Sequence, residues 1–120
     1  MDDEALAKLD YAYLTTTGRS SGQPREIEIW FALIDGRAYF LAGSRERAHW
    51  VRNLLADPQV TLRIGDRSWR GVAGVVTDAA EEARARLALV AKYAPRDGSD
   101  LSGWGRTALP VVVERVAELD

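Results

Sequence analysis

Two arginines and two serines surround a glycine-bearing turn near the start of the chain. The segment T-T-T-G-R-S-S-G-Q-P-R, residues 15–25, ends one expected strand, turns, and opens the next strand at Arg25. Arg19, Ser20, Ser21 and Gly22 fall within the turn. Backbone N–H groups, hydroxyls and guanidinium groups that converge at such a turn suit a phosphate or a carboxylate. The residues therefore indicate an anion site, and the alternative is a solvated hairpin loop.

A second segment places a serine and two arginines where a strand ends and a helix begins. In G-S-R-E-R-A-H-W-V-R-N-L, residues 43–54, the three side chains are Ser44, Arg45 and Arg47. The partial positive charge and free N–H groups of a helix N-terminus favour a phosphate. The alternative is that Ser44 only caps the helix and the arginines are surface charges. Both segments end neighbouring strands, so we expect them to share one anionic ligand.

Residues for acid–base, nucleophilic or metal chemistry are few. The chain has no cysteine, and one histidine cannot build a multi-histidine metal site. That residue, His49, has no nucleophile paired with it and is expected to be a surface group. The carboxylate pairs Glu26/Glu28 and Glu81/Glu82 fit a solvated strand face and a helix N-terminus. An enzyme of this composition must borrow its chemistry from a bound redox cofactor.

Four tryptophans could stack on a planar ring or line a pocket. Core packing is the expected role of Trp50 and Trp69. Trp30 shares an expected strand face with glutamates, which favours an exposed role. Trp104 falls in a segment expected to be a loop.

Composition narrows the class of protein. The chain has 120 residues, 47% of them hydrophobic and 28% charged, which suits one globular domain, residues 1–120. A net charge of -2 argues against a general nucleic-acid binder. No apolar run reaches the ~20 residues of a membrane span. The N-terminus is acidic, unlike a signal peptide, so we expect a cytoplasmic protein.

The periodicity of apolar residues predicts the elements that must position these side chains. Strands are expected at residues 11–17, 25–34, 37–43, 59–64, 68–77 and 108–117. Helices are expected at residues 3–9, 46–56 and 79–93, and a loop at residues 94–106. In the last helix Leu87, Val90 and Ala94 are expected on one side, and Thr77 or Asp78 as the cap.

Turn chemistry then predicts the fold. Asp35-Gly36 is a strong hairpin signal, and Gly71 and Gly74 inside a strand indicate a bulge or a close backbone approach. No strand–helix–strand unit with a glycine-rich turn is present, so a parallel nucleotide-binding sheet is not expected. The pattern predicts a mainly β fold: a six-stranded antiparallel Greek-key barrel with two to three helices.

Three segments together resemble a known family. They are T-T-T-G-R-S-S-G-Q-P-R at residues 15–25, A-G-S-R at residues 42–45, and W-V-R-N-L-L-A-D-P-Q-V at residues 50–60. They resemble the deazaflavin-dependent nitroreductases and quinone reductases, a branch of the flavin-binding split β-barrels that include pyridoxamine 5′-phosphate oxidase. The resemblance runs from about residue 11 to the last strand. It implies a split barrel and hydride transfer from reduced deazaflavin (coenzyme F-420) to a quinone, nitro compound or activated alkene.

The resemblance also implies roles for individual residues. The implied cofactor-binding residues are Arg19, Arg25, Glu28, Trp30, Ala42, Gly43, Ser44, Arg45, Trp50 and Asn53. Arg25 would contact the phosphate or tail of the cofactor, and the backbone near Trp30 would lie beside its ring. Ser44 is the candidate catalytic residue, since it could reach the reactive region of the ring. Tyr93 is the candidate substrate residue, and no metal is expected.

Two departures from the family pattern leave the cofactor open between deazaflavin and FMN. Ser20 stands where many members carry a basic residue, and the segment after Gly43-Ser44 lacks a glycine-rich insertion. The alternatives are an FMN-binding split-barrel oxidoreductase and a non-catalytic protein that binds a flavin-type cofactor. The resemblance further implies a homodimer, with the cofactor cleft near the interface and a small-molecule electron acceptor.

Overall fold

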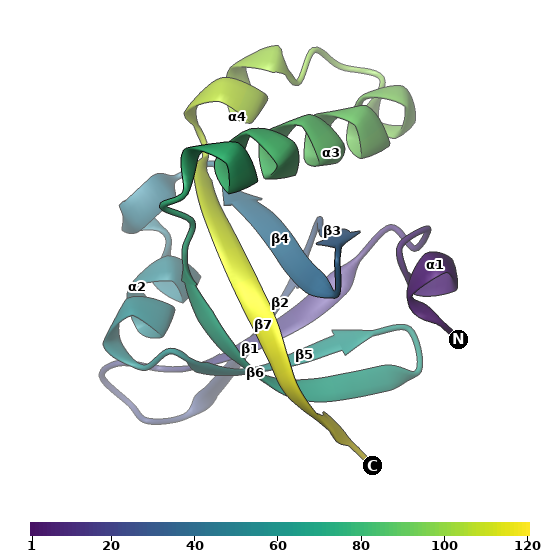
Figure 1. Cartoon of the computed structure of the whole chain (residues 1–120). Helices are drawn as coiled ribbons and strands as arrows, with labels where there is room; N and C mark the ends of the chain where they lie inside the picture. The colour runs from purple at the N-terminus through teal and green to yellow at the C-terminus, as the bar shows by residue number, and fades with distance from the viewer.

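Seven strands form one antiparallel sheet that curls into a half-barrel (Figure 1). The computed structural model describes residues 1–120. The strands are β1 (Ala12–Thr17), β2 (Pro24–Ile29), β3 (Ala32–Ile34), β4 (Arg37–Ala42), β5 (Gln59–Ile64), β6 (Arg67–Val75) and β7 (Leu109–Leu119). The helices are α1 (Asp3–Leu6), η1 (Arg45–Arg47, a 3₁₀ turn), α2 (His49–Ala56), α3 (Ala79–Asp97) and α4 (Ser102–Thr107). The strands lie in the order β2-β1-β5-β6-β7-β4-β3, so the mainly β, antiparallel prediction is confirmed at this level.

The seventh strand exists because the expected strand at residues 25–34 is broken in two. Phe31 turns its backbone away from the sheet: its N–H donates to the Tyr93 hydroxyl at 3.0 Å, and its carbonyl accepts from Lys92 Nζ at 3.0 Å. These partners on α3 replace those a continuous strand would offer. Trp30 leaves the strand face it was expected to share with glutamates. Its ring stacks on Tyr93, with centroids 4.3 Å apart.

Two turn predictions are confirmed. Asp35 and Gly36 join β3 to β4 in a two-residue turn, with φ values of 51° and 82°, which is the left-handed conformation such hairpins require. The β6–β7 register shifts between Arg70 and Gly71. A Cβ at Gly71 would lie 2.8 Å from Val113 Cγ1, so the close approach of β7 requires glycine there.

The expected helix at residues 46–56 is shorter than predicted. Ser44 makes no capping bond, and the chain first forms η1 before α2 begins at His49. Arg45 has a φ of 52°, and its guanidinium donates to the Thr107 carbonyl at 2.5 Å. The positive φ of Arg45 and the extended backbone of Ala48, with a ψ of 136°, interrupt the chain, so one continuous helix cannot form. Val51, Asn53 and Leu54 form the buried face of α2.

The expected loop at residues 94–106 is mostly helical. α3 continues to Asp97 and ends at Gly98, whose φ of 76° stops it, and α4 follows. The predicted cap is confirmed at Asp78, whose side chain accepts from Glu81 N–H at 2.8 Å. The apolar side was wrongly placed, because Leu87 is 73% exposed. The buried side of α3 consists instead of residues spaced four apart: Ala85, Leu89 and Tyr93.

Hydrophobic side chains form two clusters. The larger fills the curled sheet under α2 and contains Phe40, Leu62 and Trp69 among its 17 buried residues. The smaller packs under α3 and α4, which lie over the sheet above β4 in Figure 1. Trp69 is thus a core residue, as expected, and Trp50 packs partly buried against the larger cluster. No helix combines the length and apolar composition needed to cross a membrane.

Candidate functional site

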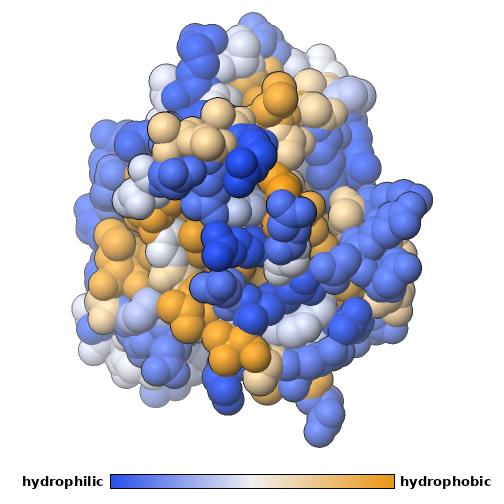
Figure 2. Space-filling view, viewed as in Figure 1, coloured by the Kyte–Doolittle hydropathy of each residue, from blue (hydrophilic) through white to orange (hydrophobic).

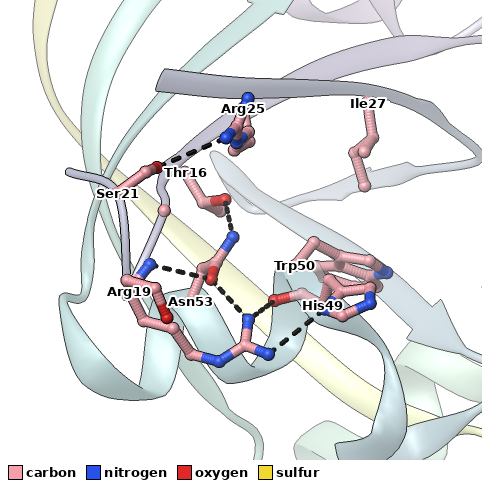
Figure 3. A pocket seen from close by; sticks show the side chains of 10 residues that line it. Thr16, Arg19, Ser21, Arg25, Ile27, His49, Trp50 and Asn53 are labelled. Atoms are coloured by element: carbon pink, nitrogen blue, oxygen red, sulfur yellow. Dashed lines mark hydrogen bonds between the residues drawn. The ribbon is translucent and has the colours of Figure 1, made fainter. Parts of the chain in front are cut away.

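The turn between β1 and β2 and the start of α2 enclose a cleft with a volume of about 470 Å³. Figure 3 shows β2 along one side of this cleft and α2 along the other. The cleft is lined by Thr16, Gly18, Arg19, Ser20, Ser21, Arg25, Ile27, His49, Trp50 and Asn53. We call it the β1–β2 cleft.

Hydrogen bonds within the β1–β2 turn stabilise it and leave two backbone N–H groups without an acceptor. Gly18 N–H donates to Gln23 O at 2.8 Å, and Gly22 N–H donates to Gly18 O at 2.8 Å. Ser21 Oγ accepts from Gln23 N–H at 3.1 Å. A Cβ at Gly18 would lie 2.6 Å from Ser21 Oγ and 3.2 Å from the Gln23 carbonyl oxygen, so a larger residue would displace the Ser21 hydroxyl from this bend. The N–H groups of Ser20 and Ser21 make no hydrogen bond within the chain, which leaves them available to an anion.

Arginine supplies the charge of the β1–β2 cleft. Arg25 lies on β2 and donates to Ser21 Oγ at 3.3 Å, and it has no carboxylate partner (Figure 3). Arg19 is the second cation, and no aspartate or glutamate lines the cleft. An uncompensated pair of guanidinium groups beside free N–H donors matches a phosphate or carboxylate ligand.

Asn53 connects the turn to α2. It is 4% exposed, and its Nδ2 donates to Thr16 Oγ1 at 3.2 Å. Its Oδ1 accepts from the Arg19 backbone N–H at 3.2 Å and from Arg19 Nη1 at 2.8 Å. The same guanidinium contacts the carbonyl and Nδ1 of His49, at 3.5 and 3.2 Å. The side chain of Arg19 is thus held along the first turn of α2.

An apolar side faces these polar groups. Trp50 and Ile27 are the two hydrophobic residues that line the β1–β2 cleft. The Trp50 ring is held edge-on against Phe40, with centroids 6.4 Å apart. A cleft with an aromatic wall at one side and cationic groups at the other fits a ligand that joins a planar ring to an anionic tail.

The structure brings together four of the residues implied to bind a cofactor. Arg19, Arg25, Trp50 and Asn53 all line the β1–β2 cleft, although they come from two segments some thirty residues apart in the chain. Their convergence follows from the packing of α2 against β1, which Asn53 secures through Thr16.

The other implied residues do not line this cleft. Glu28 accepts from the Tyr13 hydroxyl at 2.8 Å. Ala42 is buried, a Cβ at Gly43 would meet the Trp104 ring at 3.7 Å, and Ser44 is exposed. Arg45 bonds to the carbonyl of Thr107, as described. Arg45 and Arg47 of the second segment therefore do not line the cleft that Arg19 and Arg25 line, although His49, Trp50 and Asn53 of that segment do.

Trp30 and Trp104 pack against each other, and Trp104 belongs to α4. The Trp104 ring meets Trp30 edge-on, at 5.6 Å between centroids and 87° between planes. Trp104 is half-buried, so it is not the exposed loop residue that the sequence suggested.

Tyr93, the candidate substrate residue, lies in the interior. It is 1% exposed, and its hydroxyl donates to the Asp10 carbonyl at 2.8 Å. Burial raises the pKa of Tyr93 to about 12. Its neighbour Lys92 lies 3.7 Å from the Phe31 ring centroid, and burial lowers the pKa of Lys92 to about 8. Both side chains form hydrogen bonds with the backbone of Phe31.

Sequence reasoning missed three residues of the β1–β2 cleft: Thr16, Ile27 and His49. Thr16 is 1% exposed, and the alternation of β1 gave the available signal, because Ala12, Leu14 and Thr16 share one face. His49 is exposed, as expected of a surface group, and it also lines the cleft. Its spacing of four from Asn53 places both on one side of α2.

Solved structures share this fold. A conserved hypothetical protein from Mycobacterium tuberculosis is 20% identical, with a TM-score of 0.75 over 98% of this chain and 82% of that one. An F420-H2 dependent reductase is 24% identical, with a TM-score of 0.67 over 88% of this chain and 94% of that one. A putative pyridoxamine 5′-phosphate oxidase from Listeria innocua is 15% identical, with a TM-score of 0.70 over 97% and 91%. The chain is thus a half-barrel protein of the split-barrel class.

The family follows from a separate comparison. The family model of the F420-H2-dependent quinone reductases matches residues 3–116. The chain belongs to this family, as the three motifs of the sequence indicated. It is therefore an oxidoreductase whose cofactor is the deazaflavin coenzyme. The β1–β2 cleft fits such a group, since its free N–H donors and arginines suit an anionic tail and Trp50 suits a planar ring.

Proposed function

We propose that this protein transfers a hydride from reduced deazaflavin to a small electrophile, either a quinone, a nitro compound or an activated alkene. The observation that carries the proposal is the β1–β2 cleft, which pairs an aromatic wall with two arginines and no carboxylate. The F420-H2 dependent reductase that shares this fold supports the same chemistry.

The residues of the cleft divide the work of binding. Arg25 and the free N–H groups of Ser20 and Ser21 hold the anionic tail. Trp50 packs against the ring. Asn53 fixes the turn through Arg19, which keeps these donors in place before the ligand arrives. The chain thereby binds and orients the group that carries the redox chemistry.

The bound deazaflavin supplies a hydride, and a quinone that accepts it must also take up one proton to become a hydroquinone. Among the residues that line the cleft, His49 carries an imidazole, which can both donate and accept a proton. It is exposed, so water can exchange protons with it. The proton of the overall reaction comes from His49 or from water.

Binding is tested by fluorescence titration of deazaflavin with Arg25→Ala beside a matched surface control, Arg84→Ala. Arg84 is exposed on α3 and makes no hydrogen bond or ion pair. Loss of a charge-assisted contact should weaken binding by about 1–3 kcal/mol in Arg25→Ala, and Arg84→Ala should bind as the wild type does. A parallel titration with FMN tests the alternative cofactor. Absence of binding by both cofactors would refute the proposal.

Turnover separates a reductase from a protein that only carries the cofactor. Reduced deazaflavin is mixed with menadione, and its reoxidation is followed with and without the protein. We expect steady turnover well above the rate of the free cofactor. A rate equal to that of the free cofactor would favour the non-catalytic alternative.

We also propose a homodimer. Figure 2 shows hydrophobic side chains gathered over β6 and β7 on the face that Figure 1 presents. Val72 and Val116 on these strands are 45% and 56% exposed, which suits burial against a second copy. Light scattering at micromolar concentration should give the mass of two chains, and a monomer would contradict this part of the proposal.

A further inference from the structure

The contact between Arg19 and His49 favours one tautomer of the neutral imidazole. Arg19 Nη2 lies 3.2 Å from His49 Nδ1. A guanidinium can only donate, so Nδ1 must be the acceptor and the proton of the neutral ring is on Nε2. Protonation at Nδ1 would set two donors and two positive charges against each other.

We propose that His49 is a positioning residue for anionic ligands of the β1–β2 cleft. Neutral His49 holds the Arg19 guanidinium along α2, and protonated His49 releases it toward the cleft and adds its own positive charge. The ligands concerned carry a phosphate, sulfate or carboxylate group. The inference rests on the proposed function in one respect, that this cleft receives the anionic part of the cofactor.

Arg19 keeps enough contacts to stay near the cleft when it is released. Its backbone N–H still donates to Asn53 Oδ1, which anchors the residue at its Cα. On release the guanidinium gives up its contacts with Nδ1 and the carbonyl of His49, and it exchanges the neutral Asn53 Oδ1 for the charged anion. The change is thus a rotation of one side chain, with no movement of β1 or α2.

The charged residues around His49 do not neutralise the positive charge that protonation adds to its ring. The charged residues on the surrounding elements are Arg19 in the turn, Arg25 on β2, Arg45, Glu46 and Arg47 in η1, and Arg52 on α2. The one carboxylate among them, Glu46, pairs with Arg45 at 3.7 Å. Arg52 Nε donates to the Glu46 carbonyl at 3.0 Å. A proton on His49 therefore adds to a cationic neighbourhood, which an anion in the cleft would stabilise.

The linkage has a definite sign. Protonated His49 favours the anion, so the anion favours protonated His49, and binding takes up a proton. Imidazoles change charge between about pH 5 and pH 8. Affinity for an anion should therefore rise as the pH falls through that range.

The first test reads the tautomer directly. His49 is the only histidine, so the ring nitrogens in a ¹⁵N NMR spectrum of the ligand-free protein need no assignment. At pH 8 we expect the Nε2–H tautomer with Nδ1 as an acceptor. Arg19→Met should shift this pattern toward a mixture of tautomers. An Nδ1–H tautomer, or a pattern unchanged in Arg19→Met, would overturn the proposal.

The second test measures sulfate binding by calorimetry at pH 8 and pH 5.5. Sulfate stays a dianion over this range, so its own protonation contributes nothing. Affinity should rise about fivefold in the wild type and in Arg84→Gln, and less than about twofold in His49→Gln. Equal slopes in the wild type and His49→Gln, or no sulfate binding at either pH, would overturn the inference. Sulfate binding with the expected slope but no deazaflavin binding would refute the proposed function alone.

Discussion

At the scale of single residues, Asn53 links the turn to α2. One buried amide satisfies Thr16 in β1, the Arg19 backbone and the Arg19 guanidinium at once. No buried side-chain nitrogen or oxygen in the structure lacks a partner. Removal of this amide would leave the Thr16 hydroxyl and the Arg19 donors without a partner at a position where Asn53 and Thr16 are buried.

Asn53→Ala should destabilise the fold by about 1–3 kcal/mol, because buried polar groups lose their partners. Urea denaturation followed by circular dichroism measures the loss. Thr16→Val removes one partner of the same network, so the double variant should cost less than the sum of the single changes. Strict additivity would show that Asn53 and Thr16 do not act together.

At the scale of elements, α3 decides where β2 ends and β3 begins. Lys92 and Tyr93 bind the carbonyl and N–H of Phe31 from one turn of that helix. Burial affects the two side chains in opposite ways, since it disfavours the charged form of each. The pKa of Lys92 falls from 10.5 to about 8, and that of Tyr93 rises from 10.0 to about 12.

The stability of the protein should therefore peak near pH 10. Between about pH 8 and 10.5 the unfolded state holds the Lys92 proton more tightly than the folded state, so stability rises with pH. Between pH 10 and about 12 the folded state holds the Tyr93 proton more tightly, so stability falls. Denaturation from pH 7 to pH 12 measures both changes. Lys92→Met should flatten the rise and Tyr93→Phe the fall, whereas Lys8→Met should change neither.

Two glycines of β6 give a matched pair for strand packing. A Cβ at Gly71 would lie 2.8 Å from Val113 Cγ1 and 2.9 Å from the Glu114 carbonyl, but one at Gly74 would meet nothing within 4 Å. Gly71→Ala should cost about 1–3 kcal/mol through overpacking, and Gly74→Ala should stay within about 0.5 kcal/mol. Thermal denaturation of both variants compares them, and equal losses would contradict the close approach of β6 and β7.

At the scale of the whole molecule, the cleft lies between segments that the larger hydrophobic cluster holds together. β1 and α2 both pack on that cluster, and the turn and the start of α2 project from it. A ligand that bridges β2 and α2 therefore stabilises the folded state against the unfolded one, in which the two segments separate.

Deazaflavin at 100 times its dissociation constant should add about 2.7 kcal/mol to the free energy of unfolding. The melting temperature of the wild type should rise with deazaflavin concentration. For Arg25→Ala the same concentration should give a smaller rise, because its dissociation constant is larger. An identical rise in both proteins would show that the ligand binds outside the β1–β2 cleft.

Local signals determined much of the fold and part of the cleft. The Asp35-Gly36 hairpin depends on a left-handed backbone, the Asp78 cap on a short side chain with an acceptor oxygen, and the bulge at Gly71 on the absence of a Cβ. Residue type alone therefore reveals each of them. Arg19 and Arg25 could also be predicted as cleft residues, because a Gly-Ser turn between two strands places both of them beside the turn. Trp50 and Asn53, which form the opposite side of the cleft, could be identified only through the family resemblance.

The remaining features depend on contacts between distant segments, which no local pattern contains. The break between β2 and β3 exists because α3, some sixty residues later, supplies partners for Phe31. Ser44 makes no capping bond, and its neighbour Arg45 donates to Thr107, some sixty residues away. His49 enters the cleft because Arg19 meets it across the packing of β1 and α2. The sequence by itself predicted the antiparallel, mainly β class, the β1–β2 turn and the family. Only the tertiary structure decided which cations face one ligand, because hydrogen bonds across the fold set the direction of each side chain.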